Sequence, residues 1–250
     1  MTIPLGLKLS NMSQYVPKVL FLSMLFACSI PEEEVYLFSF FKDNGQDGLH
    51  LAYSRDGLEW NAFNNNESFL IPAVGNDKLM RDPCIIAGGD GKYHMVWTVS
   101  WNEKGIGYAN SADLIHWSDQ QYIPVMHHEP EARNCWSPEL FYDSESDEYM
   151  IYWATTIPGR FPKTTSTGDD AYNHRMYFTT TPDFLEFSPT ELLYDDGFNV
   201  IDATIIKEDG KYIMFLKNET ILPKAEKNIR IARSSKLQTG YTRVTGTGKG

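Results

Sequence analysis

Short apolar runs separated by polar turns make up most of this chain. Beyond residue 34, β-branched and aromatic runs of four to seven residues alternate with segments rich in Asp and Gly, which is typical of strands and turns. Asp-Gly at 90–91 and at 209–210 favours tight hairpins, because these turns need a positive φ that glycine adopts easily. No part of this region shows the period of an amphipathic helix. The pattern predicts an all-β fold.

One block of this pattern returns four times. Each copy has a short apolar run, a polar turn, an aromatic-rich run and a closing tag of the type Ser-x-Asp-x-x-x-Trp, and the copies begin near Val35, Cys84, Leu140 and Ala203. A repeat of about 40 to 60 residues made of short strands is typical of a β-propeller. We expect each tag to form a turn and to place its final aromatic side chain between neighbouring blades.

A carboxylate stands just ahead of the first apolar run in three of the four copies. These carboxylates are Asp82, Glu139 and Asp202, at intervals of 57 residues (139 − 82) and 63 residues (202 − 139). Side chains at one structural position of successive blades converge on the propeller axis, so we expect the three to meet there. Glycosidic bonds are usually cleaved between two carboxyl groups, and a third can raise the pKa of the acid. The pattern therefore indicates a carboxylate active site.

Four further residues are candidates for contact with a sugar. Trp101 and Trp136 stand near blade openings, where an indole ring either stacks on a sugar or packs between blades. Arg160 and His174 belong to a long segment, 157–175, that interrupts the third copy. Long ordered loops are often functional, so this segment is expected either to form a wall of a pocket or to be a plain surface loop.

Composition excludes some partners. The 250 residues carry a net charge of −11 and have an isoelectric point near 5.0, whereas binding to nucleic acid needs an excess of Lys and Arg. An uncharged oligosaccharide or polysaccharide is compatible with this charge. The six His residues never stand at metal-ligand spacing with Cys or Glu. We therefore expect no cofactor and no metal site, with a calcium ion on the propeller axis as an open alternative.

The first residues of the chain indicate export. Lys18 precedes an apolar run, 19–27, that has the length of a signal-peptide core and is too short to span a bilayer. Leu25-Phe26-Ala27-Cys28 resembles a bacterial lipobox, so we expect a signal peptide over 1–27, lipidation of Cys28, a tether over 28–34 and the propeller over 35–250. An ordinary secretory signal is the alternative. We expect a monomeric cell-surface or periplasmic lipoprotein that touches the membrane only through its lipid, with Cys84 and Cys135 as free thiols.

The blade starts together resemble a known family. They read Arg81-Asp82-Pro83, Trp136-Ser137-Pro138-Glu139 and Ile201-Asp202-Ala203, and in this order they resemble glycoside hydrolase family 43, the five-bladed β-propeller arabinofuranosidases and xylosidases. The resemblance implies an inverting hydrolase of arabinofuranosyl or xylosyl linkages in plant polysaccharides. It implies that Asp82 is the general base, that Asp202 tunes the pKa of the acid, and that Glu139 belongs to the substrate pocket.

The sequence departs from the family pattern at one motif, and two alternative functions stay open. The family's general acid is the Glu of a Glu-Gly-Pro motif about one blade beyond Asp202, and this chain has no such motif. The repeat length allows about four of five blades, so we expect a chain truncated at its C-terminus that can be inactive by itself. A family-32-like β-fructosidase, with Glu139 as the acid, is one alternative, although Leu140 stands where that family has Cys. A glycan-binding surface lipoprotein without catalysis is the other.

Overall fold

The computed structural model describes residues 34–165 and 167–244, and the described residues from Val35 onward form one compact unit. The predicted signal peptide and the predicted lipidation site, Cys28, lie outside the described residues. No helix in the described part of the chain is long and apolar enough to cross a membrane.

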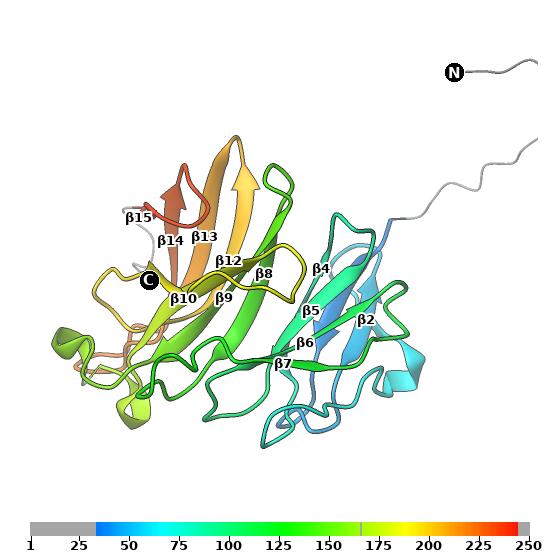
Figure 1. Ribbon diagram of the computed structural model, residues 1–250, viewed down its shortest axis with the longest axis horizontal. Helices are drawn as coiled ribbons and strands as arrows, with labels where there is room; N and C mark the ends of the chain where they lie inside the picture. The colour runs from blue at the N-terminus through cyan, green and yellow to red at the C-terminus, as the bar shows by residue number, and fades with distance from the viewer. Residues whose placement is uncertain (1–33, 166, 245–250) are drawn as a thin grey trace, which may run out of the picture. The chain divides into compact units, whose positions relative to one another are not determined.

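Four antiparallel sheets make up this unit, each built from strands that follow one another in sequence (Figure 1). The first sheet contains β1 (Tyr36–Phe40), β2 (His50–Ser54) and β3 (Asn61–Ala62). The second contains β4 (Arg81–Ala87), β5 (Tyr93–Thr98), β6 (Ile106–Ser111) and β7 (Gln121–Ile123). The third contains β8 (Trp136–Asp143), β9 (Glu148–Thr156), β10 (His174–Thr181) and β11 (Glu191–Tyr194). The fourth contains β12 (Val200–Glu208), β13 (Lys211–Asn218), β14 (Ile229–Ser234) and β15 (Thr242–Arg243).

The sheets are blades around a common channel. One hollow of about 530 Å³ is lined by residues of β1, β4, β8 and β12, so every blade contributes a strand to the axis. Helical structure in the described chain is limited to three short 3₁₀ turns, η1 (Asn64–Asn66), η2 (Pro162–Thr164) and η3 (Asp169–Ala171). The predictions of an all-β fold and of about four propeller blades are confirmed.

The first copy of the repeat begins later in the blade than its sequence suggested. In the other blades the tag follows the third strand, at the ends of β6, β10 and β14, but in the first blade it follows β2. β1 and β2 are therefore equivalent to the second and third strands of the other blades, and the expectation that β1 is a first strand is wrong. Among the described strands β1 pairs with β2 alone, and its Tyr36 and Phe38 side chains are exposed.

The tags form the predicted turns, and in the third tag a residue other than the final aromatic is the more deeply buried between blades. In the third tag the Thr181 hydroxyl accepts hydrogen bonds from the backbone N–H groups of Asp183 and Phe184. Phe184 is 1% exposed and its ring stacks 4.1 Å from that of Tyr108 in the second blade. Trp60, the final aromatic residue of the first tag, is 43% exposed. Phe187, at the seventh position of the third tag, is partly buried against the same cluster of second- and third-blade residues, so the fourth position adds to the predicted packing of the final aromatic.

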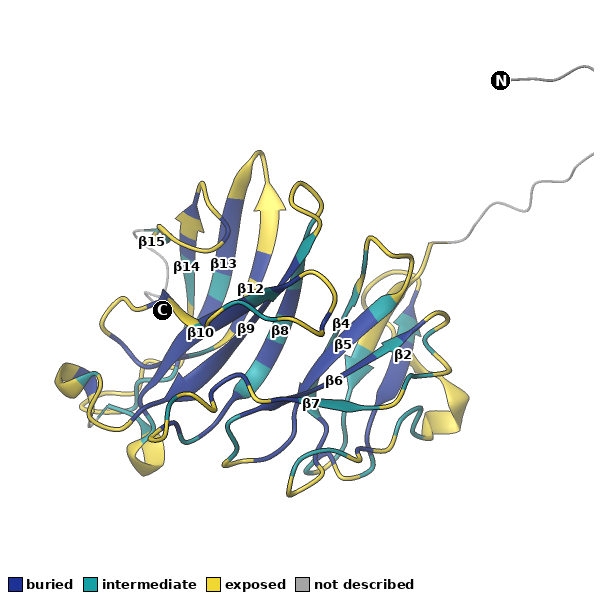
Figure 2. Ribbon diagram, in the orientation of Figure 1, coloured by how far each residue is buried: buried dark blue, intermediate teal, exposed yellow. Residues whose placement is uncertain are grey.

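The core lies in the middle strands of the blades, where both faces of a sheet are covered. Figure 2 shows buried residues concentrated along β5, β9 and β13. Trp97 in β5 is fully buried, and the facing residue of β6 is Gly107, where an added Cβ would lie 2.0 Å from the indole ring. A glycine at this position lets the large ring lie flat against the neighbouring strand, as close packing of the interior requires.

A buried arginine orders the long segment between β9 and β10. Arg175 in β10 is 1% exposed, and its guanidinium donates hydrogen bonds to Asp195, Asn173 and Thr164. The same group lies 4.3 Å from the centre of the Phe161 ring. Phe161 and Thr164 belong to the long segment itself. The Arg175 side chain therefore holds this segment against the third blade.

Replacing Arg175 by methionine should destabilise the protein by about 2 to 4 kcal/mol, because Asp195, Asn173 and Thr164 lose a buried charged partner. Urea unfolding followed by tryptophan fluorescence measures this free energy of unfolding. The matched control is Arg233→Met, at an exposed position of β14, which should change stability by less than about 0.5 kcal/mol. Equal stability of the two variants would show that Arg175 does not anchor the segment.

Candidate active site

Three residues at the start of the innermost strands share an unusual backbone conformation. Asp82, Ser137 and Asp202 have φ angles of 51°, 46° and 52°, in the left-handed region. Each stands where the pairing of the first and second strands shifts by a residue, which is a β-bulge. Bulges turn a side chain out of the regular alternation of a strand and are frequent next to active sites. The bulges therefore direct three side chains to one end of the channel.

Glu139 does not share this position, so the expectation of three equivalent carboxylates is wrong. The equivalent residues are Asp82, Ser137 and Asp202, at intervals of 55 (137 − 82) and 65 (202 − 137). Glu139 lies two residues further along β8 and matches Cys84 and Thr204 instead. Aligning the two sequence repeats so that Pro83 matches Pro138 would have shown that Asp82 corresponds to Ser137 and not to Glu139.

Glu139 lies deeper in the channel, among side chains of the inner strands. Its Oε2 accepts a hydrogen bond of 2.9 Å from the hydroxyl of Tyr152. Burial raises the pKa of Glu139, and this outweighs the hydrogen bonds from Thr204 and Tyr152, which lower it. The side chain lines the channel together with Asp82 and Asp202, but it does not line the smaller pocket at the channel end.

Hydrogen bonds connect the bulges of the three blades. The Thr98 hydroxyl, at the end of β5, donates to Oδ2 of Asp82 at 3.2 Å and accepts from the backbone N–H of Ser137 at 2.9 Å. The Ser137 hydroxyl donates to Oδ1 of Asp202 at 2.8 Å. The Lys217 ammonium, from β13, lies 3.4 Å from Oδ2 of Asp202. A continuous chain of polar contacts therefore runs from Asp82 to Lys217.

Asp202 lies close enough to Asp82 to influence its pKa. Burial, followed by the negative charge of Asp202, raises the pKa of Asp82, and the Arg81 guanidinium opposes this shift. Lys217 pairs with both Asp202 and Glu219, at 3.4 and 3.1 Å. A carboxyl group with a raised pKa is a stronger base when ionised, so Asp82 is suited to accept a proton.

Two tryptophans flank the carboxylates. Trp101 and Trp136 meet edge to face with ring centres 5.4 Å apart, and Arg81 lies 4.3 Å from the Trp101 ring. Oδ1 of Asn44, from the first blade, accepts hydrogen bonds from both Arg81 and the Trp101 indole. These side chains and the aspartates enclose a pocket of about 280 Å³, here called the carboxylate pocket, whose lining residues are Arg81, Asp82, Thr98, Trp101, Trp136, Ser137, Ile201, Asp202 and Lys217.

The other two predicted contacts lie outside the lining of the carboxylate pocket. His174 is 1% exposed and lies behind Trp136, with the ring centres 4.9 Å apart, so it supports the indole. Tyr172, at the end of the long segment, packs against the same indole at 4.5 Å. Arg160 instead forms an ion pair with Glu129 at 2.5 Å. The long segment thus supports the pocket wall through Tyr172.

Sequence reasoning missed Thr98, Ser137, Lys217 and Asn44. Thr98 is the last residue of β5 and Lys217 the next-to-last residue of β13, and they pair with Arg81 and Ile201, the residues just before the bulges. A polar residue after a buried apolar run, as in Trp97-Thr98 and Leu216-Lys217, is a signal for them. Asn44 lies in the first polar turn and has no local signal, because its role depends on contact with another blade.

The sequence also predicts two free thiols. Cys84 and Cys135 form no disulfide, which confirms the prediction of two free thiols. Residues 34–165 and 167–244 contain no group of three or more His, Cys, Asp or Glu side chains placed to hold a metal ion.

Comparison with known proteins adds the family. Residues 32–249 match a family described as a probable glycosyl hydrolase domain, related to glycoside hydrolase family 43. The chain belongs to this glycosyl hydrolase family. An alpha-L-arabinofuranosidase of Bifidobacterium longum subsp. longum is 23% identical over 198 residues, which cover 70% of this chain and 18% of that protein. The chain thus spans less than a fifth of the length of this curated relative.

Solved structures of family 43 share the propeller of this glycosyl hydrolase domain. A thermostable family-43 glycoside hydrolase superposes with a TM-score of 0.63 at 14% identity, over 86% of this chain and 70% of that chain. A xylan beta-1,4-xylosidase from Bacillus halodurans C-125 gives 0.58 at 15% identity, over 85% and 40% of the two chains. These likenesses establish the fold.

The influence of Asp202 on the pKa of Asp82 can be tested by titration. Replacing Asp202 by asparagine should lower the pKa of Asp82, because a neighbouring negative charge that favours its protonated form is removed. Asparagine also accepts the left-handed backbone at this position. Carboxyl ¹³C NMR of Asp82 across the acid range measures the midpoint. The control Asp119→Asn, at an exposed position, should leave the titration midpoint of Asp82 unchanged. An unchanged midpoint in the Asp202 variant would contradict the effect of the Asp202 charge on Asp82.

Proposed function

We propose that this domain hydrolyses glycosidic bonds by inversion, with Asp82 as the general base. The observation that supports this most strongly is the pairing of Asp82 and Asp202 at equivalent bulges, joined by hydrogen bonds and placed in one pocket with two tryptophans. In an inverting reaction a carboxylate removes a proton from water as the water attacks the anomeric carbon. Asp82 would take this proton at Oδ1, since Oδ2 already accepts from Thr98.

Asp202 and Lys217 would set the charge around that reaction. Asp202 is held by Ser137 and Lys217 through separate oxygens. Its negative charge raises the pKa of Asp82, which strengthens Asp82 as a base, and it would stabilise the positive charge that develops on the sugar ring in the transition state. Lys217 limits the repulsion between the two carboxylates.

We further propose pentose-containing plant polysaccharides, with arabinofuranosyl or xylosyl linkages, as the substrates. The support is the family, the named arabinofuranosidase and xylosidase relatives, and a small pocket with indole side chains. Indole rings bind the apolar faces of sugars, and a net positive surface is not needed for an uncharged ligand. Trp101 is 40% exposed, so part of its ring is free to contact a sugar.

An activated substrate tests the base without requiring a strong general acid. A para-nitrophenolate group leaves without protonation, so hydrolysis of para-nitrophenyl α-L-arabinofuranoside or β-D-xyloside depends on the base and on transition-state charge. Asp82→Asn should lower kcat/KM on the better of these substrates by at least about a hundredfold, while sugar binding persists. Asparagine is chosen because it tolerates the φ of 51° at this position.

The matched control is Asp209→Asn, which makes the same change at a left-handed φ of 49° in the exposed turn between β12 and β13. It should hydrolyse both substrates at the wild-type rate. If the wild-type protein binds arabino- or xylo-oligosaccharides but hydrolyses neither aryl glycoside, the domain is a glycan-binding module. Equal loss of activity in both variants would remove Asp82 from the catalytic role.

A further inference from the structure

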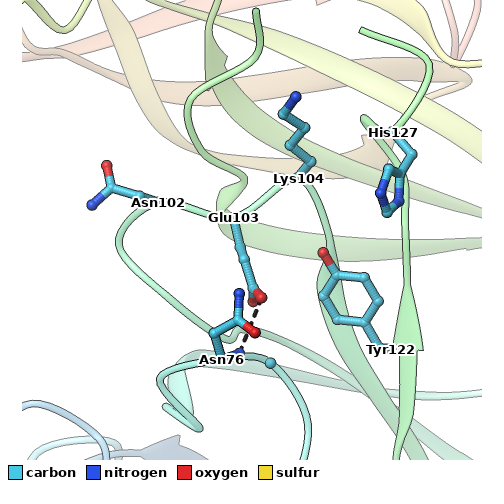
Figure 3. A pocket seen from close by; sticks show the side chains of 7 residues that line it. Asn76, Asn102, Glu103, Lys104, Tyr122 and His127 are labelled. Atoms are coloured by element: carbon cyan, nitrogen blue, oxygen red, sulfur yellow. Dashed lines mark hydrogen bonds between the residues drawn. The ribbon is translucent and has the colours of Figure 1, made fainter. Parts of the chain in front are cut away.

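A second and larger hollow lies beside the carboxylate pocket. It has a volume of about 560 Å³ and is lined by side chains that all carry polar groups, here called the rim hollow: Asn76, Asn102, Glu103, Lys104, Tyr122 and His127. Figure 3 shows the Glu103 side chain and the Tyr122 ring on either side of this space. Its size falls in the range of small-molecule sites.

The walls of the rim hollow are fixed by hydrogen bonds to one central segment. Oε1 of Glu103 accepts from the backbone N–H of Asn76 at 3.0 Å, which holds the loop before β4 (Figure 3). The carbonyl of Lys104 accepts from the backbone N–H of Met126 at 2.9 Å, and the Lys104 ammonium donates to the carbonyl of Pro130. Two loops are thus fastened to residues 103–104, so a ligand would meet a hollow that is already formed, which reduces the entropy lost on binding.

Tyr122 lines one side of the rim hollow, and its hydroxyl can donate a hydrogen bond at all physiological pH values. Its ring lies against the backbone of Gly105, where an added Cβ would be 2.3 Å from the ring carbon that bears the hydroxyl. Burial, together with the negative charge of Glu103, raises the pKa of Tyr122 to about 12. The phenol therefore stays protonated and supplies a hydrogen-bond donor to the lining of the rim hollow.

The chemistry of the lining favours a neutral ligand with many hydroxyl groups. Asn76 and Asn102 each supply a donor and an acceptor, which match neighbouring sugar hydroxyls. Glu103 and Lys104 have opposite charges, so the lining has no excess charge to select an anion or a cation. Apolar side chains, which would anchor a lipid or a drug-like ligand, are not among the six.

The rim hollow adjoins the carboxylate pocket through neighbouring residues. Trp101 lines the carboxylate pocket and Asn102, the next residue, lines the rim hollow. Oδ1 of Asn102 accepts from the hydroxyl of Tyr172 at 3.5 Å, and Tyr172 packs against Trp136 of the carboxylate pocket. A chain of sugars could therefore pass from one site to the other across Trp101.

We propose that the rim hollow is a second binding site for the same polymer, which takes neutral sugar residues beyond the one held at the carboxylates. This inference rests on the proposed function. In this proposal, residues around the rim hollow, in the first two blades, distinguish long sugar chains from short ones. The residues at the bulges bind the sugar that reacts. Short oligosaccharides fill the carboxylate pocket alone, whereas longer ones also contact the rim hollow.

Binding of oligosaccharides of two lengths to a double variant tests this site. Asn76→Ala with His127→Ala removes two exposed side chains from the rim hollow and leaves its hydrogen-bonded frame in place. Every protein in this titration also carries Asp82→Asn, so that the sugars bind without being cleaved, and wild type refers here to the residues of the rim hollow. Isothermal titration calorimetry with arabinohexaose and xylohexaose should show about a tenfold loss of affinity for the hexasaccharide that the wild type binds better. The affinity for arabinobiose and xylobiose should stay at the wild-type value.

The matched control replaces Asn61 and His128 by alanine, two exposed residues outside the rim hollow, and should bind like the wild type. Unchanged hexasaccharide affinity in the rim variant, or an equal loss for disaccharide and hexasaccharide, would overturn the second site and leave the proposed hydrolase function standing. Failure of the wild type to bind any of the four sugars would overturn both.

Discussion

The chain of polar contacts from Asp82 through Thr98 and Ser137 to Asp202 is the constraint on which the site depends. It joins three blades at the point where each innermost strand bulges, so the blades must meet in one register for it to form. The bulges have a backbone conformation that is costly for residues other than glycine. Hydrogen bonds across the blades and the packing of residues such as Phe184 hold the strands in this arrangement.

The same contacts explain how two carboxylates coexist in a partly buried pocket. Unpaired negative charges in such a place would destabilise the fold, because burial and mutual repulsion both favour protonation. Arg81 and Lys217 supply opposite charges, and each is also fixed from elsewhere, Arg81 by Asn44 and Lys217 by Glu219. The first blade takes part in the site through Asn44, which orients both Arg81 and Trp101. Charge balance and shape therefore come from all four blades.

Local features of the fold could be predicted from the sequence, and features set by contact between blades could not. Strand runs, Asp-Gly hairpins and tag turns depend on neighbouring residues, and they appear where expected. Glu139 lies two residues beyond the bulge position that Asp82 and Asp202 occupy, which the pairing of β8 with β9 shows directly and which an alignment of Pro83 with Pro138 would have indicated. Arg175, Lys217 and the rim hollow depend on segments distant in sequence. His174 was a candidate for contact with a sugar but lies beneath Trp136, because Tyr172 and the indole cover it.

A crystal structure of the protein soaked with arabinose and, separately, with xylose tests the central claim most directly. The account predicts one of these sugars in the carboxylate pocket, within hydrogen-bond distance of Asp82 and Asp202 and in contact with the ring of Trp101 or Trp136. A sugar bound only elsewhere on the propeller, with the two aspartates free of it, would contradict the claim that the paired bulges form the reaction centre.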